Sequence, residues 1–118
     1  MRVPVRIPLL GKIAKIQYPD ILTDESGQAL NGETMPDSNL IRIAKQHHAN
    51  DTDLFATLFH ELLHLALHYS GHAEMFEAKQ EEALVLALEM GMAPLLSLKP
   101  KLKGARFKEI EMPWEEAS

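Results

Sequence analysis

The clearest pattern of hydrophobic and polar positions lies between residues 54 and 68. When successive residues are placed 100° apart, as on an α-helix, the polar side chains fall in one sector about 100° wide. These polar residues are Thr57, His60, Glu61, His64 and His68, and apolar side chains fill the remaining arc. The pattern predicts a mostly buried helix whose narrow polar strip carries neither Lys nor Arg, which is unusual for a strip that only faces solvent.

Both ends of this helix carry recognisable signals. Asn50 or Asp51 is placed to cap its first turn, and the acids Asp51 and Asp53 suit the positive end of the helix dipole. Gly71, after Ser70, is placed to stop the helix just beyond Tyr69. We therefore predict a helix from about residue 51 to about residue 69.

A second helix is predicted after a short connection. It begins near Ala73 and runs to Gly91 or Ala93, where Gly91 and Pro94 are expected to end it. Its side chains are apolar nearly all round, so its helical wheel discriminates poorly between a buried face and an exposed one.

Strands are predicted in the first half of the chain. Residues 2–18 alternate well enough for one or two strands; in the second case a turn at Gly11-Lys12 separates Val3–Leu9 from Ile13–Tyr18. Residues 19–39 are rich in turn formers and read as a long loop with room for a hairpin. Leu40–Ala44 alternates cleanly and is predicted to be a strand.

The order of these elements predicts an α+β fold, in which a small, mostly antiparallel sheet packs on the first helix and the second helix lies nearby. At 118 residues, 46% of them hydrophobic, the chain can form one core but not two. We expect a single domain over residues 1–98 and an irregular or partly ordered C-terminal tail over residues 99–118.

Composition narrows the function classes. The chain has no cysteine, which excludes disulfides and a thiolate metal site, and it has no apolar run long enough to cross a bilayer. The net charge is −5, with acids concentrated in residues 50–98, where Lys79 is the single cation. These features argue against a nucleic-acid or membrane partner and favour a cytoplasmic protein; they leave the oligomeric state open.

The polar strip contains the pentapeptide His60-Glu61-Leu62-Leu63-His64, an HExxH motif. On a helix, this spacing places two imidazoles one turn apart with a carboxylate beside them. His60 and His64 are therefore candidate zinc ligands, and Glu61 is the candidate general base that takes a proton from water. Two histidines do not hold zinc tightly, so the hypothesis requires a third ligand, for which Glu81 and Glu82 lie at a credible distance.

Other polar residues of the chain are weaker candidates for site residues. His68 lies one turn beyond His64 on the same strip and is a candidate for a supporting role, while His72 is a less favoured ligand. Tyr18 and Tyr69 are candidate oxyanion donors, although each also suits a packing role. The remaining histidines, His47 and His48, were considered either as residues that line the site or as ordinary surface histidines.

The sequence resembles the ImmA/IrrE group of small HExxH metallopeptidases and related phage-encoded metallopeptidases. The resemblance rests on Thr57–His68 and on the segment from Glu82 to Pro94, where Glu82-Ala83 matches a Glu-Ala step of the family. Leu84 departs from the family pattern, which has Asn at that position. The resemblance covers about a third of the chain and implies a gluzincin-type arrangement, in which a Glu of the next helix is the third zinc ligand. Family register favours Glu82 for this role, whereas the helical wheel mildly favours Glu81. We predict Glu82 as the third ligand, because the wheel of the second helix discriminates poorly.

A different class of zinc peptidases, the metzincins, continues the motif as HExxHxxGxxH. Here Leu67 stands at the Gly position and Ser70 at the last His position, so that class is disfavoured.

The resemblance implies a zinc-dependent peptidase that hydrolyses peptide bonds in a protein substrate, such as a repressor or a phage component. It also implies that the strand before the active helix, here Leu40–Ala44, pairs with the substrate backbone. Two alternatives stay open. One is a non-catalytic, phage-associated structural or regulatory protein that uses the metal for stability, and the other is a helical interaction protein without metal. The base Glu61 argues against the first, because a purely structural site does not need it.

Overall fold

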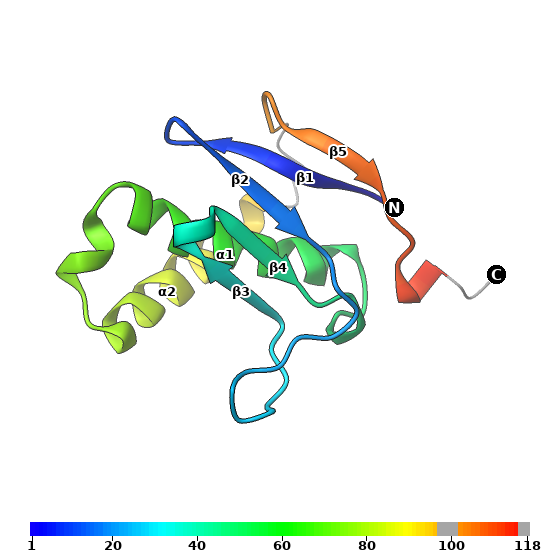
Figure 1. Ribbon diagram of the computed structural model, residues 1–118, viewed down its shortest axis with the longest axis horizontal. Helices are drawn as coiled ribbons and strands as arrows, with labels where there is room; N and C mark the ends of the chain where they lie inside the picture. Colours follow the sequence, from blue (N-terminus) through cyan, green and yellow to red (C-terminus); the bar gives the residue numbers. More distant parts are fainter. Residues whose placement is uncertain (97–101, 116–118) are drawn as a thin grey trace.

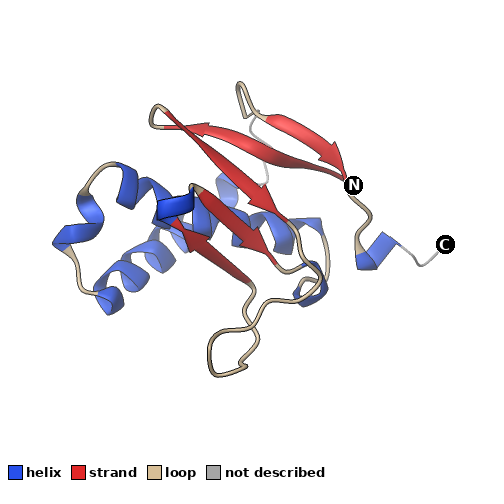
Figure 2. Ribbon diagram, viewed as in Figure 1, coloured by secondary structure: helices blue, strands red, loops and turns tan. Residues whose placement is uncertain are grey.

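The computed structural model describes residues 1–96 and 102–115 and has the α+β fold that the sequence predicts. Figures 1 and 2 show a twisted sheet lying against helix α1, with helix α2 beside α1. Among the described residues the sheet has five strands in the order β3-β4-β2-β1-β5. Only β2 and β4 are parallel, so the sheet is mostly antiparallel.

The predicted N-terminal hairpin is confirmed as β1 (Arg2–Leu9) and β2 (Lys12–Gln17), which pair antiparallel. Its turn lies one residue earlier than predicted, at Leu10-Gly11. Both turn residues have positive φ, at 49° and 79°, a combination that suits the twist of a two-residue hairpin. Buried side chains of both strands contribute to the core.

The predicted long loop contains a strand of its own, β3 (Gly32–Met35). A short 3-10 turn, Pro36–Ser38, joins β3 to β4 (Leu40–Ile43), and the two strands pair antiparallel. Asn39, at φ 52°, closes the turn. β3 is therefore the strand at one end of the described sheet, and β4 lies between β3 and β2.

Helix α1 (Asp51–Tyr69) has the bounds that the sequence predicts. The Asn50 side chain accepts a hydrogen bond from the Asp53 backbone N–H, and Gly71, at φ 80°, follows the last turn. Leu54, Leu58 and Leu65 follow one another at spacings of four and seven residues, so they lie on one face of the helix. They are buried and pack on the sheet with Ile41, Ile43 and their neighbours. This packing places the polar strip of α1 away from the centre of the core.

Helix α2 (Ala78–Leu96) starts later and ends later than predicted. A 3-10 turn, His72–Met75, takes the place of its expected first turn. At the other end, α2 continues through Gly91, because one glycine costs a helix only about 1 kcal/mol. Pro94 also lies within α2 and does not end it. α2 packs against α1, and its Val85 is fully buried.

The prediction that residues after 98 form an irregular tail is wrong for much of residues 102–115. Arg106–Glu109 form β5, which pairs antiparallel with β1, and Met112 is fully buried in the core. All four side chains of β5 are exposed, so no alternation in the sequence marked a strand that backbone pairing holds in place. Residues 99–101 and 116–118 of the predicted tail lie outside the described residues.

Candidate metal site

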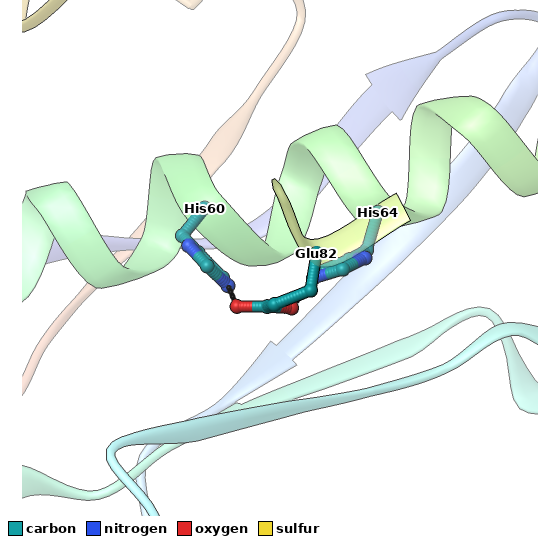
Figure 3. Close-up of side chains that lie close together, drawn as sticks. All are labelled: His60, His64 and Glu82. Carbon is teal, nitrogen blue, oxygen red and sulfur yellow. Dashed lines mark hydrogen bonds and ion pairs between the residues drawn. The ribbon is translucent and has the colours of Figure 1, made fainter. Parts of the chain in front are cut away.

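The two histidines of the HExxH motif face one glutamate of α2. The Nε2 atom of His60 lies 3.1 Å from Glu82 Oε1, and the Nε2 atom of His64 lies 2.9 Å from Glu82 Oε2. Figure 3 shows the Glu82 carboxylate between the two imidazoles. One ligand atom from each of the three residues can be chosen so that all lie within 4.8 Å of one another.

This donor set fits a zinc ion. Zinc is commonly held by imidazole nitrogens and carboxylate oxygens, about 2.0–2.2 Å from each, and catalytic sites use three protein ligands and leave one position open. His60, His64 and Glu82 supply those ligand types from two packed helices. Glu82 is also the most exposed of the three, with 48% of its side chain accessible, so the group is open to solvent on that side.

The structure separates the two glutamates between which the sequence left a choice. Glu82 faces both Nε2 atoms, whereas Glu81 lies on the other side of His64, with its Oε2 2.7 Å from Nδ1. The Glu-Ala step shared with the resembled family, rather than the helical wheel, indicated Glu82, the residue that lies between the imidazoles.

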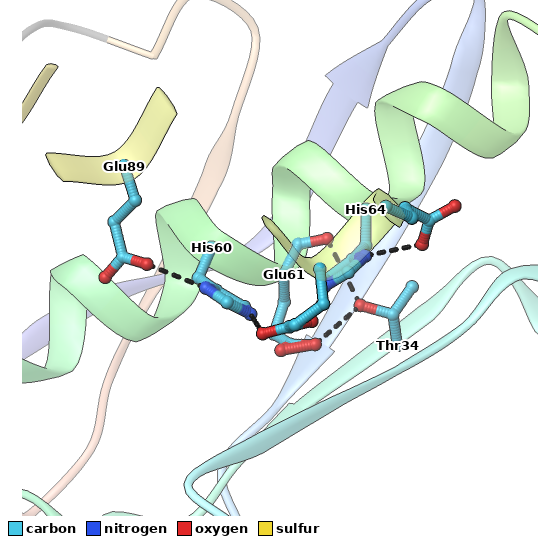
Figure 4. Close-up of polar contacts among 7 residues, drawn as sticks. Thr34, His60, Glu61, His64 and Glu89 are labelled. Carbon is cyan, nitrogen blue, oxygen red and sulfur yellow. Dashed lines mark hydrogen bonds and ion pairs between the residues drawn. The ribbon is translucent and has the colours of Figure 1, made fainter. Parts of the chain in front are cut away.

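Glu61 lies beside this contact and is buried under strand β3. It is only 7% exposed, and the Thr34 hydroxyl lies 3.0 Å from its Oε1 and 3.1 Å from its backbone carbonyl (Figure 4). Burial raises the pKa of the Glu61 carboxyl, while the hydrogen bond from Thr34 and the nearby imidazoles oppose that rise. The structure thus places a buried carboxyl beside the two histidines of the motif.

The close approach of β3 to α1 depends on Gly32. A Cβ atom at this position would lie 2.9 Å from Thr57 Cγ2 and 3.2 Å from Glu61 Cγ. Because Gly32 has no side chain, β3 can run directly over Glu61, and Thr34, two residues along the same strand, reaches the Glu61 carboxyl.

Two hollows adjoin the site. One, of about 270 Å³, is lined by residues that include Thr34, Glu61, His64 and Glu81, and the other, of about 370 Å³, includes Lys12 and Tyr69. Both are lined by Pro36 and His68, so the two hollows are neighbours. His68 thus lines both hollows next to the motif and is not part of the three-residue group.

The candidate oxyanion donors are both engaged elsewhere. Tyr18 is buried in the core, and its hydroxyl donates to the Pro4 carbonyl at 2.6 Å, so it has the packing role that was the alternative to an oxyanion donor. The Tyr69 hydroxyl donates to Asn39 Oδ1 at 2.6 Å, beside the second hollow.

The other histidines are outside the three-residue group. His72 is exposed, with its Nδ1 2.8 Å from Ser70 Oγ. His47 Nδ1 lies 2.6 Å from the Leu30 carbonyl. His48, in contrast to the expected surface position, is buried, and its two ring nitrogens contact the Ala44 carbonyl and the Thr57 hydroxyl.

Sequence reasoning did not identify Thr34 or Glu89 as site residues. Glu89 Oε2 lies 2.7 Å from His60 Nδ1. The available signal for Glu89 was its spacing of seven residues from Glu82, which places both on one side of a helix. Thr34 had no signal, because it lies in a segment that reads as loop.

Comparisons of the chain with family models, with curated proteins and with solved structures found no match. In the part of the chain that the structure describes, neither long helix is apolar enough over a sufficient length to span a bilayer.

Proposed function

We propose that the protein is a zinc-dependent metallopeptidase that cleaves peptide bonds in a protein substrate. The observation that carries this proposal is the convergence of His60, His64 and Glu82 beside the buried carboxyl of Glu61. Two imidazoles and one carboxylate form a ligand set of hydrolytic zinc sites, and a separate carboxylate beside them is the general base that such sites require.

A zinc ion bound here would polarise the substrate carbonyl and make water a stronger nucleophile. Glu61 takes the proton from the attacking water and gives it to the leaving amine nitrogen when the peptide bond breaks. Its raised pKa makes its carboxylate a stronger base than that of an exposed glutamate. The hydrogen bond from Thr34 keeps this carboxylate in one orientation.

The substrate is proposed to bind as an extended peptide along β3. The sequence-based assignment of this role to Leu40–Ala44 is wrong, because β4 is paired with β3 on one side and β2 on the other. β3 lies at the end of the described sheet, carries Thr34 and borders the first hollow, so it can offer its backbone to a peptide strand. The two neighbouring hollows, both lined by His68, provide room for side chains of the peptide.

The resemblance to ImmA/IrrE-type metallopeptidases supports the same proposal. It rests on Thr57–His68 and on the Glu82-Ala83 step. By that resemblance alone, the substrate class is a repressor or a phage component.

One observation favours a second candidate, a non-catalytic structural or regulatory protein stabilised by the metal. Both tyrosines that could stabilise an oxyanion donate their hydroxyls to other groups, Tyr18 to Pro4 and Tyr69 to Asn39. The buried Glu61 argues for catalysis, because a purely structural metal site has no use for a base.

The substitution Glu61→Gln distinguishes the two candidates. In the zinc-loaded protein it should leave zinc affinity and folding nearly unchanged and abolish cleavage of a library of quenched fluorescent peptides. Glu77→Gln, which removes an exposed acid just before α2, serves as the control and should cleave like the wild type. Zinc-loaded wild type without cleavage of the library or of denatured protein would favour the structural role, and unchanged cleavage by Glu61→Gln would place the base elsewhere.

A further inference from the structure

Each imidazole of the candidate metal site contacts a carboxylate on both of its nitrogens. The two Nε2 atoms face Glu82, as described above. On the opposite sides, His60 Nδ1 lies 2.7 Å from Glu89 Oε2, and His64 Nδ1 lies 2.7 Å from Glu81 Oε2. Figure 4 shows these outer contacts on both rings. All three glutamates belong to α2, so one helix supplies both the central carboxylate and the two outer ones.

The antiparallel packing of α1 and α2 explains this arrangement. His60 contacts the later residue Glu89, and His64, one turn further along α1, contacts the earlier residue Glu81. Glu82 and Glu89 are seven residues apart and therefore lie on one side of α2, while Glu81 precedes Glu82 directly. The spacing of the acids thus matches the spacing of the histidines.

The outer contacts have a chemical consequence for metal binding. A neutral imidazole carries one N–H, so a ring that binds a metal through Nε2 must keep its proton on Nδ1. A carboxylate that accepts this Nδ1–H fixes the tautomer, holds the ring plane and makes Nε2 more electron-rich. Hydrogen bonds to an ionised acceptor are also shorter and stronger than neutral ones, in line with both 2.7 Å distances.

Exposure separates the outer glutamates from the central one. The side chains of Glu81 and Glu89 are 15% and 23% exposed, whereas Glu82 is 48% exposed. The outer pairs are thus better shielded from water and salt, while the central carboxylate lies where an ion can enter.

We infer that Glu81 and Glu89 are positioning residues, which hold the imidazoles of His64 and His60 ready to bind a metal through Nε2. This inference rests on the proposed zinc site and deepens it. It also gives Glu81 a role distinct from that of Glu82: Glu81 acts through His64 and is not itself a ligand.

Zinc affinity provides the first test. Zinc dissociation constants are measured by competition with a chelator for the wild type, Glu81→Ala, Glu81→Gln, Glu89→Ala and Glu89→Gln, with Glu77→Gln as the control for loss of one negative charge. The alanine variants should bind zinc about 10–100-fold more weakly, and the glutamine variants, which keep an acceptor for the Nδ1–H, should lose less. Glu82→Ala should lose more affinity than any of them.

The second readout is nuclear magnetic resonance of the imidazole Nδ1–H protons in the zinc-loaded protein. A general loss of fold would change the signals of both rings, whereas the loss of one outer carboxylate should change the signal of one ring. Glu81→Gln should shift the His64 signal and leave the His60 signal in place, and Glu89→Gln should do the reverse. A wild type that binds no zinc would overturn both the proposed function and this inference. Zinc bound by the wild type and equally well by the Glu81 and Glu89 variants would overturn the positioning role alone, as would a loss in Glu81→Ala as large as that in Glu82→Ala.

Discussion

Replacing Gly32 with alanine tests how closely β3 is held against α1. The new Cβ atom would lie 2.9 Å from Thr57 Cγ2, 3.2 Å from the Arg42 carbonyl oxygen and 3.2 Å from Glu61 Cγ. Ordinary contacts of a Cβ atom are 3.4–4 Å. The Arg42 carbonyl cannot retreat freely, because its strand pairs with β3 and with β2.

The expected cost follows from these distances. Overfilling a packed site costs about 1–3 kcal/mol, and the lower flexibility of alanine in the unfolded chain offsets about 0.4–1 kcal/mol of it. We therefore expect Gly32→Ala to lower the free energy of unfolding by about 1–2 kcal/mol. Because any relief moves β3 outward, the Thr34 hydroxyl should also move away from Glu61, and peptidase turnover should fall more than zinc affinity.

Urea denaturation followed by circular dichroism measures the stability change. Gly91→Ala is the matched control, because a Cβ atom there has no neighbour within 4 Å and the residue lies inside α2. That control should gain about 0.5–1 kcal/mol from better helix propensity. A Gly32→Ala protein as stable as the wild type would show that β3 does not approach α1 as described.

Three further predictions concern the base, the tail and the buried tyrosine. Thr34→Val should reduce peptidase turnover about tenfold or more while zinc affinity changes little, because the Glu61 carboxylate loses a hydrogen bond worth about 1.5–3 kcal/mol. Thr52→Val, at an exposed position, is the control. Equal turnover in the two variants would contradict the role of Thr34. Met112→Ala should cost about 2–5 kcal/mol of stability in urea denaturation, against little change for the exposed Met90→Ala, and a small effect at Met112 would remove the tail from the core. Burial raises the pKa of Tyr18 above its ordinary value, so the folded protein keeps the phenol protonated; its contribution to stability is complete below about pH 10 and decreases as the pH rises further. At about pH 8, Tyr18→Phe should have a free energy of unfolding about 1–2 kcal/mol below that of the wild type, because the Pro4 carbonyl loses its donor. Between about pH 8 and pH 11 the stability of the variant should fall less than that of the wild type. Parallel curves of stability against pH for the two proteins would refute this reasoning.

The sequence predicted best those elements whose signals are local. α1 has its capping residue Asn50, its apolar stripe and its stop at Gly71 close together in the chain, and its bounds were predicted correctly. β1 and β2 likewise show alternation on both sides of a short turn.

Elements that depend on distant partners were predicted less well. β5 has four exposed side chains and is held by backbone pairing with β1, about a hundred residues earlier in the chain. β3 lies in a segment rich in turn formers and is fixed by pairing with β4 and by the missing side chain of Gly32. Without β3, the position of β4 within the sheet could not be foreseen, which is why β4 was wrongly expected to face the substrate.

The candidate site shows the same division. The motif placed His60, Glu61 and His64 on one helix strip by local geometry alone. The contacts of Glu89 with His60 and of Thr34 with Glu61 join residues 29 and 27 positions apart, and they depend on how two helices and a strand pack.

The most direct test of the central claim is the zinc content and zinc affinity of the purified wild-type protein beside His60→Ala, His64→Ala and Glu82→Ala. If these three residues hold the metal, the wild type should bind about one zinc per chain and each substitution should abolish tight binding, with the fold checked by circular dichroism. A wild type with no affinity for zinc, or a folded His64→Ala variant that binds zinc as tightly as the wild type, would contradict the account.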